Sequence, residues 1–321
     1  MKVAIIGGGV IGGGWAARFL LAGWDVAVFD PDPDAARKVD EVLANARASA
    51  PLLSAAPAAE GRLSFAATLE DAAADADHVQ ESVSERLTLK HAVFASIQAA
   101  TDAPIGSSTS GFTPSQLQEG AARPGAIFVA HPFNPVYLLP LVEVVASSAN
   151  DPALVDRAMA TLTALGMHPV RVRKEIDAHI GDRLLEAVWR EALWLVKDGV
   201  ATTEEIDDVI RMGFGLRWAQ MGLFETYRIA GGEAGMKHFM AQFGPALQWP
   251  WSRLTDVPEF TDDLVDLIAD QSDAQSGHLS VRELERIRDA NLVAFMRALK
   301  DRDWGAGRVL NAHDAAQGAK D

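Results

Sequence analysis

The sequence predicts an α/β protein, with a Rossmann-type doubly wound sheet followed by an all-helical C-terminal domain. Short apolar runs alternate with helical segments through the first half of the chain. A glycine-rich turn follows the first run, and from Ile180 onward the apolar period becomes that of helices. We therefore expect a first domain over residues 1–178, a helical domain over residues 179–303, and a weakly ordered tail over residues 304–321.

The first strand, residues 2–6, leads into the turn Gly7-x-Gly9-x-x-Gly12. Gly7 permits the tight turn, Gly9 lets a pyrophosphate approach the backbone, and Gly12 lets the following helix pack against the strand. The first turn of that helix offers free N–H groups to an anion. The residues that we expect to bind a dinucleotide here are Gly7, Gly8, Gly9, Val10, Ile11 and Gly12.

The second strand, residues 25–29, ends in Asp30, which lies 18 residues after Gly12. A carboxylate at this position accepts hydrogen bonds from the adenosine ribose and repels a 2′-phosphate. The cofactor is therefore expected to be NAD rather than NADP. A glycine-rich turn without a ligand is the alternative, and the agreement of strand, glycines, helix and acid disfavours it.

The rest of the first domain continues the alternation of strands and helices, which predicts a parallel doubly wound sheet. Strands are expected at residues 63–65, 78–83, 105–108, 126–131, 141–145 and 168–173. Helices are expected at residues 35–48, 69–74, 87–100 and 151–165.

Beyond a boundary near residues 174–182, the chain shows helical signals. One helical face collects Leu184, Leu185, Val188, Ala192, Leu195 and Val196. Thr202-x-x-Glu205 is a capping box that opens another helix, and Ser280-x-x-Glu283 opens a later one.

Composition excludes several classes of function. The net charge of −15 disfavours nucleic acid or an anionic membrane as a partner. The absence of cysteine excludes disulfides and thiolate chemistry, and we expect no metal site. No apolar run approaches the ~20 residues that span a bilayer. Since the first strand starts at residue 2, we expect no signal peptide and a cytoplasmic protein.

A histidine and a glutamate mark the expected catalytic centre. His131 lies at the C-terminal end of a predicted strand, where open α/β sheets bind ligands. Glu143 lies inside the next apolar strand, and a buried glutamate needs a partner. If the two strands are neighbours, Glu143 holds the imidazole in one tautomer, as required of a base that removes a hydroxyl proton while hydride leaves the same carbon. A core histidine and a structural acid are the alternative.

The chain resembles the 3-hydroxyacyl-CoA dehydrogenase superfamily over roughly residues 2–300. The similar motifs are Gly7-x-Gly9-x-x-Gly12, Glu81-x-x-x-Glu85 with Lys90, Ser107-Ser108-Thr109-Ser110, His131-Pro132-Phe133-Asn134-Pro135 and Leu141-Val142-Glu143. The resemblance implies that His131 is the general base and that Glu143 orients it. It also implies that Ser110 contacts the reacting oxygen, that Asn134 and Lys90 lie near the nicotinamide, and that Glu85 lies on the ribose side. For Ser110 and Asn134, a role in a local turn is the alternative.

Two departures from the family pattern point away from a CoA ester. Asp182 stands where the family carries an active-site asparagine, and the added negative charge suits a cationic substrate. A helix N-cap is the alternative role of Asp182. The segment 31–71 has four basic residues against seven acids, which is poor electrostatics for the phosphates of CoA. We expect a small substrate without CoA.

Aromatic residues are concentrated in the second half. Six of the eight tryptophans lie beyond residue 188, namely Trp189, Trp194, Trp218, Trp249, Trp251 and Trp304. Aromatic faces attract quaternary ammonium groups by ~0.5–2 kcal/mol per contact. We expect Trp189, Trp218 and Phe224 to contribute to the substrate site. A place in the helical core or in a dimer interface is the alternative for each ring.

Within the superfamily, residues 189–194, 215–220 and 131–141 are similar to the branch that oxidises L-carnitine with NAD. Carnitine is a 3-hydroxy acid with a trimethylammonium group on C4, and the implied product is 3-dehydrocarnitine. The alternatives are L-gulonate, as in the lambda-crystallin branch, another free 3-hydroxy acid, or a short 3-hydroxyacyl-CoA. A non-catalytic NAD-binding protein is the alternative of a different class, and it predicts loss of the histidine–glutamate pair. The resemblance also implies a homodimer.

Overall fold

The computed structural model describes residues 1–54, 58–230, 238–241, 252, 259, 261–276 and 278–318. It divides into two compact units, which are described one at a time. The first unit comprises residues 1–182 and 286–321, and the second comprises residues 183–285. Trp249 and Trp251 lie outside the described residues.

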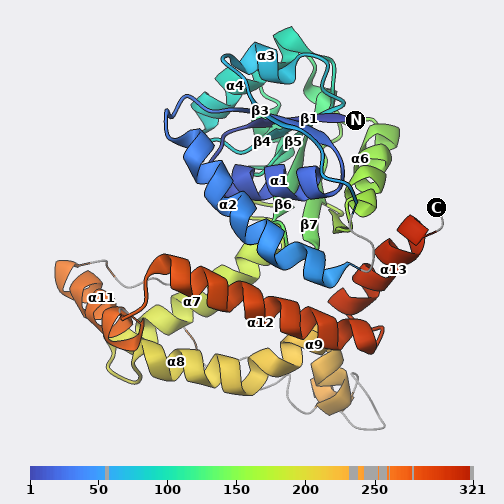
Figure 1. Ribbon diagram of the computed structural model, residues 1–321. Helices are drawn as coiled ribbons and strands as arrows, with labels where there is room; N and C mark the ends of the chain where they lie inside the picture. Colours follow the sequence, from blue (N-terminus) through green and yellow to red (C-terminus); the bar gives the residue numbers. More distant parts are fainter. Residues whose placement is uncertain are drawn as a thin grey trace. The chain divides into compact units, whose positions relative to one another are not determined.

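The first unit is built on an eight-stranded sheet with the strand order β3-β2-β1-β4-β5-β6-β7-β8 (Figure 1). The strands are β1 (Lys2–Ile6), β2 (Asp25–Phe29), β3 (Leu63–Phe65), β4 (His78–Glu81), β5 (Ile105–Ser107), β6 (Ile127–Pro132), β7 (Leu141–Val145) and β8 (His168–Val172). This order, with strands added on both sides of β1, is that of a doubly wound Rossmann sheet and confirms the predicted fold class.

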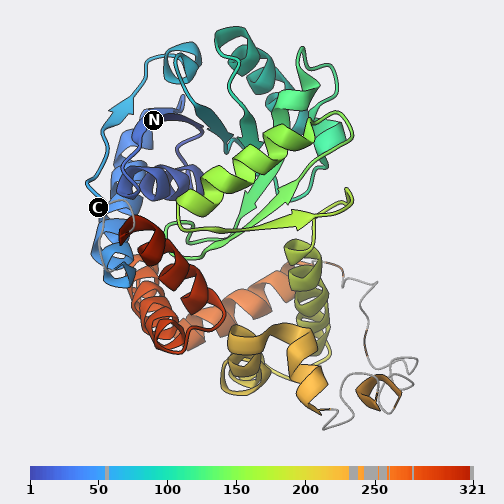
Figure 2. The same cartoon turned by 90° about the vertical axis from the view of Figure 1, so that its right-hand side faces the viewer.

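The helices of the first unit form a layer on each face of the sheet. Their bounds are α1 (Val10–Leu21), α2 (Ala35–Ser49), α3 (Leu69–Ala73), α4 (Leu87–Ala100), α5 (Pro114–Leu117) and α6 (Pro152–Ala164). Successive strand residues point to opposite faces, so Val3 and Ile5 pack with α1, α2 and α6, whereas Ala4 and Ile6 pack with α3, α4 and α5. Figure 2 shows α6 beside the last strands of the sheet.

The last two strands correct the expectation of a wholly parallel sheet. β7 runs antiparallel to β6, and β8 is parallel to β7. The physical reason is the short connection between Pro132 and Leu141, since a parallel pair needs a crossover of a dozen or more residues. The antiparallel pairing places His131 directly opposite Glu143.

The chain after residue 285 returns to the first unit. Helices α12 (Val281–Asp301) and α13 (Ala306–Gly318) supply Val293, Met296 and Leu310 to the core cluster that contains α1 and α2. The sequence predicts a helical domain as far as residue 303 and then a weakly ordered tail. The structure instead has helix α13 within residues 304–321, because its apolar side chains pack against this core.

The second unit is helical in its described residues. It contains most of α7 (Gly181–Lys197), then α8 (Thr203–Val209), a π-helical turn η3 (Ile210–Phe214), α9 (Gly215–Ala230) and α11 (Asp262–Ser276). The predicted capping box opens α8: the Thr202 hydroxyl accepts the Glu205 N–H, and the Glu205 carboxylate accepts the Thr202 N–H.

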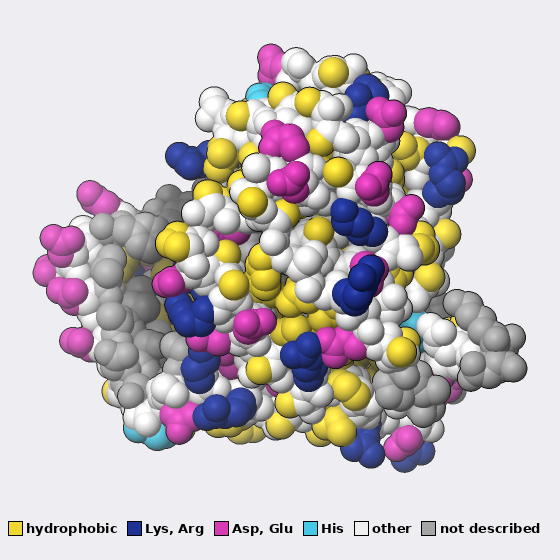
Figure 3. Space-filling view, turned by 45° about the horizontal axis from the view of Figure 1, so that its top comes forward, with side chains coloured by type: hydrophobic (Ala, Val, Ile, Leu, Met, Phe, Trp, Pro, Cys, Tyr) yellow, Lys and Arg dark blue, Asp and Glu magenta, His cyan; other side chains and the backbone are white. Residues whose placement is uncertain are grey.

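The surface carries charges of both signs. Figure 3 shows Lys and Arg side chains scattered among acidic ones on the face drawn, rather than gathered into a basic stripe over its described residues. In the described part of the chain, every helix is too short or too polar to cross a lipid bilayer.

Candidate active site

The glycine turn after β1 is shaped by close contacts on two sides and by open space on the third. Gly7 has a φ of +101°, and a Cβ on it would lie 2.6 Å from the Ser82 carbonyl oxygen. A Cβ on Gly12 would lie 1.8 Å from the Gly7 carbonyl oxygen, whereas a Cβ on Gly9 would have no neighbour within 4 Å. The helix therefore starts directly against the strand, and the space in front of Gly9 can accept a pyrophosphate.

Asp30 lies beside this turn, at the end of β2. Its Oδ2 accepts the Gly8 N–H at 2.6 Å, and its Oδ1 accepts the Asp32 N–H at 2.8 Å. The two N–H groups fix the carboxylate next to the glycines, where ribose hydroxyls need an acceptor. Val10 and Ile11 form the first turn of α1, and Val10 is exposed. The glycine turn, the first turn of α1 and the Asp30 carboxylate together fit NAD.

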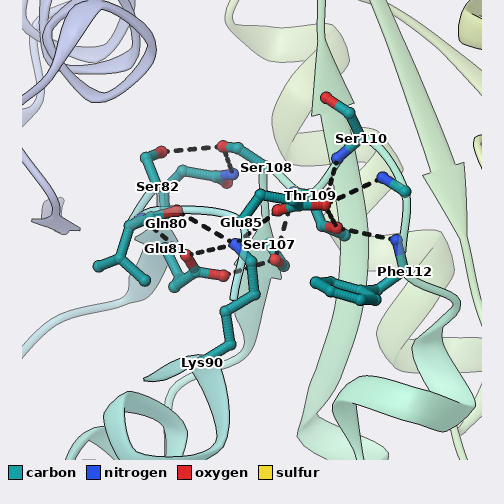
Figure 4. A network of polar contacts seen from close by, with 12 residues as sticks. Gln80, Glu81, Ser82, Glu85, Lys90, Ser107, Ser108, Thr109, Ser110 and Phe112 are labelled. Carbon is teal, nitrogen blue, oxygen red and sulfur yellow. Dashed lines mark hydrogen bonds and ion pairs between the residues drawn. The ribbon is translucent and has the colours of Figure 1, made fainter. Parts of the chain in front are cut away.

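A buried ion-pair network connects β4, α4 and the end of β5 (Figure 4). The Lys90 ammonium lies 2.9 Å from Glu81 Oε1 and 3.2 Å from Glu85 Oε2, and it also donates to the Val83 carbonyl. Glu81 accepts a further hydrogen bond from the Ser107 hydroxyl. Lys90 is only 1% exposed, so the structure places it beneath the site surface, in contact with Glu85.

Glu85 joins this network to the loop that carries Ser110. Its Oε1 accepts the Thr109 hydroxyl and the N–H groups of Ser110 and Gly111. Burial alone would raise the pKa of Glu85, but the Thr109 hydroxyl, the Gly111 N–H and the Lys90 ammonium together bring this pKa below its ordinary value. An ionised Glu85 thus holds the loop in one conformation.

His131 and Glu143 form the hydrogen-bonded pair that the sequence predicts. His131 Nδ1 lies 3.0 Å from Glu143 Oε2, and the two residues are 5% and 2% exposed. Because a carboxylate only accepts, Nδ1 carries the proton and Nε2 of the neutral ring has a free lone pair. The imidazole is thus oriented with its accepting nitrogen away from Glu143.

The second oxygen of Glu143 is bound by the start of α7. Its Oε1 accepts the N–H groups of Ile180 at 3.0 Å and Gly181 at 3.1 Å. A Cβ on Gly181 would lie 2.2 Å from the Phe133 ring and 3.2 Å from Glu143 Oε2, so a larger residue at this position would have to displace these side chains. Burial raises the pKa of Glu143, but hydrogen bonds from His131, Gly181 and Ile180 outweigh it and lower the pKa below its ordinary value.

Two further polar side chains approach the accepting nitrogen of His131. The Ser110 hydroxyl lies 3.2 Å from Nε2, and the Asp182 carboxylate lies 3.6 Å from it with 26% of its side chain exposed. Asn134 follows β6 and is exposed. The structure therefore brings His131, Glu143, Ser110 and Asp182 together, with Asn134 three residues along the chain.

Sequence reasoning missed His179, a fully buried histidine whose ring centroid lies 5.4 Å from that of His131. Its signal in the sequence is the segment Asp177–Arg183, which departs from the family pattern. The backbone N–H groups of Ile180 and Gly181 were also missed, since backbone contacts leave no residue-type signature.

The three predicted aromatic residues belong to the second unit. Trp189 and Phe224 are exposed, and the Trp218 ring centroid lies 4.6 Å from that of Phe214. Exposed rings can receive a ligand or a partner, but their relation to His131 stays a prediction.

Two family models match the chain. One is described as the NAD-binding domain of 3-hydroxyacyl-CoA dehydrogenase and matches residues 2–176. The other is described as the C-terminal domain of the same enzyme and matches residues 179–260.

Curated relatives are similar over nearly the whole chain. An L-carnitine dehydrogenase/betainyl-CoA thioesterase of Ruegeria pomeroyi is 72% identical over 98% of this chain, but the match covers only 65% of that protein. The chain thus spans about two thirds of the length of this relative. An L-carnitine dehydrogenase of Mesorhizobium japonicum is 59% identical over 96% of this chain and 87% of its own length.

Solved structures agree on the fold. An NAD+-dependent 5-dehydrogenase of 5-formyl-3-hydroxy-2-methylpyridine-4-carboxylic acid superposes with a TM-score of 0.77 at 26% identity, covering 93% of this chain and 98% of its own. A 3-hydroxyacyl-CoA dehydrogenase of Archaeoglobus fulgidus has a TM-score of 0.58 at 22% identity, covering 93% and 99% of the two chains.

Proposed function

The chain belongs to the 3-hydroxyacyl-CoA dehydrogenase family, and from that premise we propose that it oxidises the 3-hydroxyl group of L-carnitine with NAD. The observation that carries the substrate assignment is the Asp182 carboxylate, 3.6 Å from Nε2 of His131. The relatives named above point to the same substrate.

NAD, when bound, supplies the hydride acceptor, and the chain supplies the rest of the chemistry. Gly7 to Gly12 and Asp30 would hold the dinucleotide, with Asp30 accepting hydrogen bonds from the ribose. Glu85 and Lys90 would support the neighbouring loop, and Asn134 would position the nicotinamide.

His131 is the proposed general base. Its Nε2 lone pair takes the proton of the substrate hydroxyl, while Nδ1 remains bonded to Glu143. Glu143 stabilises the imidazolium that forms, and the N–H groups of Ile180 and Gly181 keep Glu143 ionised. Ser110 donates a hydrogen bond to the reacting oxygen, since its hydroxyl already lies 3.2 Å from Nε2.

Asp182 is the proposed partner of the substrate ammonium. In carnitine, three covalent bonds separate the hydroxyl oxygen from the quaternary nitrogen. A hydroxyl bound at Nε2 therefore brings the ammonium within reach of a carboxylate close to that nitrogen. Trp189, Trp218 and Phe224 are proposed to supply aromatic contacts to the methyl groups.

The extent of the matches supports a dehydrogenase role for this length of chain. The Mesorhizobium japonicum relative is named only L-carnitine dehydrogenase, and its match covers 96% of this chain and 87% of its own length. The Ruegeria pomeroyi relative, whose name gives two activities, extends beyond the match, which covers 65% of its length. We also propose a homodimer, which light scattering of the purified protein would test.

A panel of substrates tests the assignment. L-carnitine, D-carnitine, 3-hydroxybutyrate, L-gulonate and 3-hydroxybutyryl-CoA are each assayed with NAD and with NADP. We expect the highest kcat/KM for L-carnitine with NAD. Turnover of 3-hydroxybutyryl-CoA without turnover of carnitine would contradict the proposal.

The role of the base is tested by His131→Ala. We expect kcat to fall by about 10²–10⁴-fold while NADH binding persists. His168→Ala, which changes an exposed histidine of β8, is the control and should behave like the unmodified protein. An unchanged rate in His131→Ala would mean that His131 is not the base.

A further inference from the structure

His179 is a buried titratable group to which the proposed mechanism gives no part. It is 0% exposed, and its Nε2 lies 3.2 Å from the Thr109 carbonyl oxygen. Because a carbonyl only accepts, Nε2 carries the proton. Nδ1 is then a buried acceptor, and it has no hydrogen-bond partner among the described residues. Burial lowers the pKa of His179, which keeps the ring neutral.

The backbone around His179 is held in an unfavourable conformation. Ala178 and His179 have φ values of +59° and +51°, in the left-handed region that residues with a Cβ avoid. The Ala178 N–H donates to the Gly111 carbonyl, and the His179 N–H donates to the Ile176 carbonyl. Contacts of this kind must hold the turn, since the local conformation does not favour it.

This turn directs two consecutive N–H groups toward the same carboxylate oxygen. The N–H groups of Ile180 and Gly181 converge on Glu143 Oε1, as in a backbone nest that binds an anion. On its other side, the turn is bonded to the Thr109 and Gly111 carbonyls, on both sides of Ser110. The turn thus contacts the support of His131 Nδ1 and the loop that faces His131 Nε2.

We propose that His179 is a positioning residue that fixes both hydrogen-bond partners of His131 by tying the Thr109–Gly111 loop to the nest around Glu143. A charged ring would repel the imidazolium that forms on His131, 5.4 Å away between ring centroids, so the neutral form suits the role. The proposal rests on the proposed function of His131 as the base.

The test compares His179→Phe, which keeps a ring and removes the donor, with His179→Gln, which keeps a donor of similar reach. His91→Phe is the matched control. His91 Nε2 also lies within hydrogen-bond distance of a carbonyl, 2.8 Å from that of Gln116, but His91 is not part of this site. The tautomer of His131 is read from nitrogen NMR of the NADH complex, and kcat is measured with L-carnitine.

In His179→Phe we expect a mixture of His131 tautomers and a kcat lowered by about tenfold or more, since small misplacements of catalytic groups are costly. NADH affinity should be unchanged, His179→Gln should recover most of the rate, and His91→Phe should match the unmodified protein. A His179→Phe protein with an unaltered His131 tautomer and rate would overturn the proposal.

If His179→Phe does not fold, the nitrogen spectrum of the unmodified protein decides, because a protonated or Nδ1–H His179 at neutral pH contradicts the proposal. If carnitine is not a substrate, the His131 tautomer still reports on the positioning role, so the two proposals fail separately.

Discussion

The Asp182 carboxylate lies 3.6 Å from His131 Nε2, the imidazole nitrogen that Glu143 does not contact. His131 is therefore placed between two carboxylates, one on each ring nitrogen. Glu143 is buried and bound by backbone N–H groups, whereas Asp182 is partly exposed. The first arrangement fixes the base, and the second leaves a negative charge available to a ligand.

Replacement of Asp182 by asparagine should weaken catalysis with a cationic substrate selectively. A carboxylate and a cation about 4 Å apart attract each other by roughly 4 kcal/mol at an effective dielectric constant near 20, before desolvation is subtracted. We expect Asp182→Asn to lower kcat/KM for L-carnitine by about 10–100-fold, which corresponds to roughly 1.4–2.8 kcal/mol. Steady-state kinetics with L-carnitine and with uncharged-tail 3-hydroxybutyrate measures the effect.

The activity toward 3-hydroxybutyrate should hold or rise in Asp182→Asn, because that substrate has no cation for Asp182 to bind. Asp177→Asn removes an exposed carboxylate of the same segment and should leave both activities as they are. An equal loss of activity with both substrates would mean that Asp182 acts on His131 rather than on the substrate ammonium.

Replacement of Glu143 by glutamine should remove the function of the base without removing its ring. The glutamine oxygen can still accept the N–H groups of Ile180 and Gly181, which directs its NH2 group toward His131 Nδ1. That donor favours the tautomer with the proton on Nε2, so the ring can no longer accept the substrate proton. We expect kcat to fall by about 10²–10⁴-fold.

NADH binding by Glu143→Gln, measured by fluorescence titration, should be unchanged, which separates loss of the base from loss of the fold. A kcat close to that of the unmodified protein would contradict the assigned tautomer.

The ionised Glu143 carboxylate also contributes to the stability of the folded chain. Since its folded pKa lies below the ordinary value of 4.5, its contribution is present above pH 4.5 and is lost as the pH falls through the folded pKa.

The parts of the site that the sequence predicted are those with a residue-type signature at a strand end. At Gly7 and Gly12 a Cβ would collide with the backbone, Gly9 leaves open space for a ligand, and Asp30 follows the second strand at the expected spacing. His131 and Glu143 could be paired because a buried acid needs a partner, and the register confirms that they lie opposite each other.

The missed features depend on backbone geometry and long-range packing. The antiparallel direction of β7 was implicit in the short chain between Pro132 and Leu141, but the strand–helix alternation outweighed it. The turn at Ala178 and His179 uses left-handed residues that are not glycine, so no local signal marks it. Helix α13 is held by the distant core of α1 and α2, which local propensity does not reveal.

Cofactor choice should depend on the charge of Asp30. Asp30→Asn keeps an oxygen that can accept the Gly8 N–H and removes the charge that repels a 2′-phosphate. We expect the ratio of kcat/KM with NAD to that with NADP to fall by about 10–100-fold, the size of a lost hydrogen bond to a charged group. Asp32→Asn changes a partly exposed acid that pairs with Lys38 and serves as the control. An unaltered ratio would place the ribose elsewhere.

His78 should contribute to the loss of stability in acid. Its ring is buried near Phe19 and Phe128, and burial lowers its pKa from 6.5 to about 4 despite the contact with Gln80. Between these two values the unfolded chain binds a proton that the folded chain does not. The free energy of unfolding therefore rises with pH across this window, by at most about 1.4 kcal/mol per pH unit from this group.

Above pH 6.5, His78 is neutral in both the folded and the unfolded chain and costs no stability. As the pH falls toward 4, keeping His78 neutral in the folded chain costs progressively more stability. His78→Phe keeps an aromatic ring beside Phe19 and Phe128 and removes the titrating group. Urea unfolding at several pH values should show a shallower decline for His78→Phe than for the unmodified protein between pH 6.5 and 4. His91→Phe, which removes a histidine from the surface of α4, should retain the full decline. Equal slopes in His78→Phe and the unmodified protein would mean that His78 is not held neutral by burial.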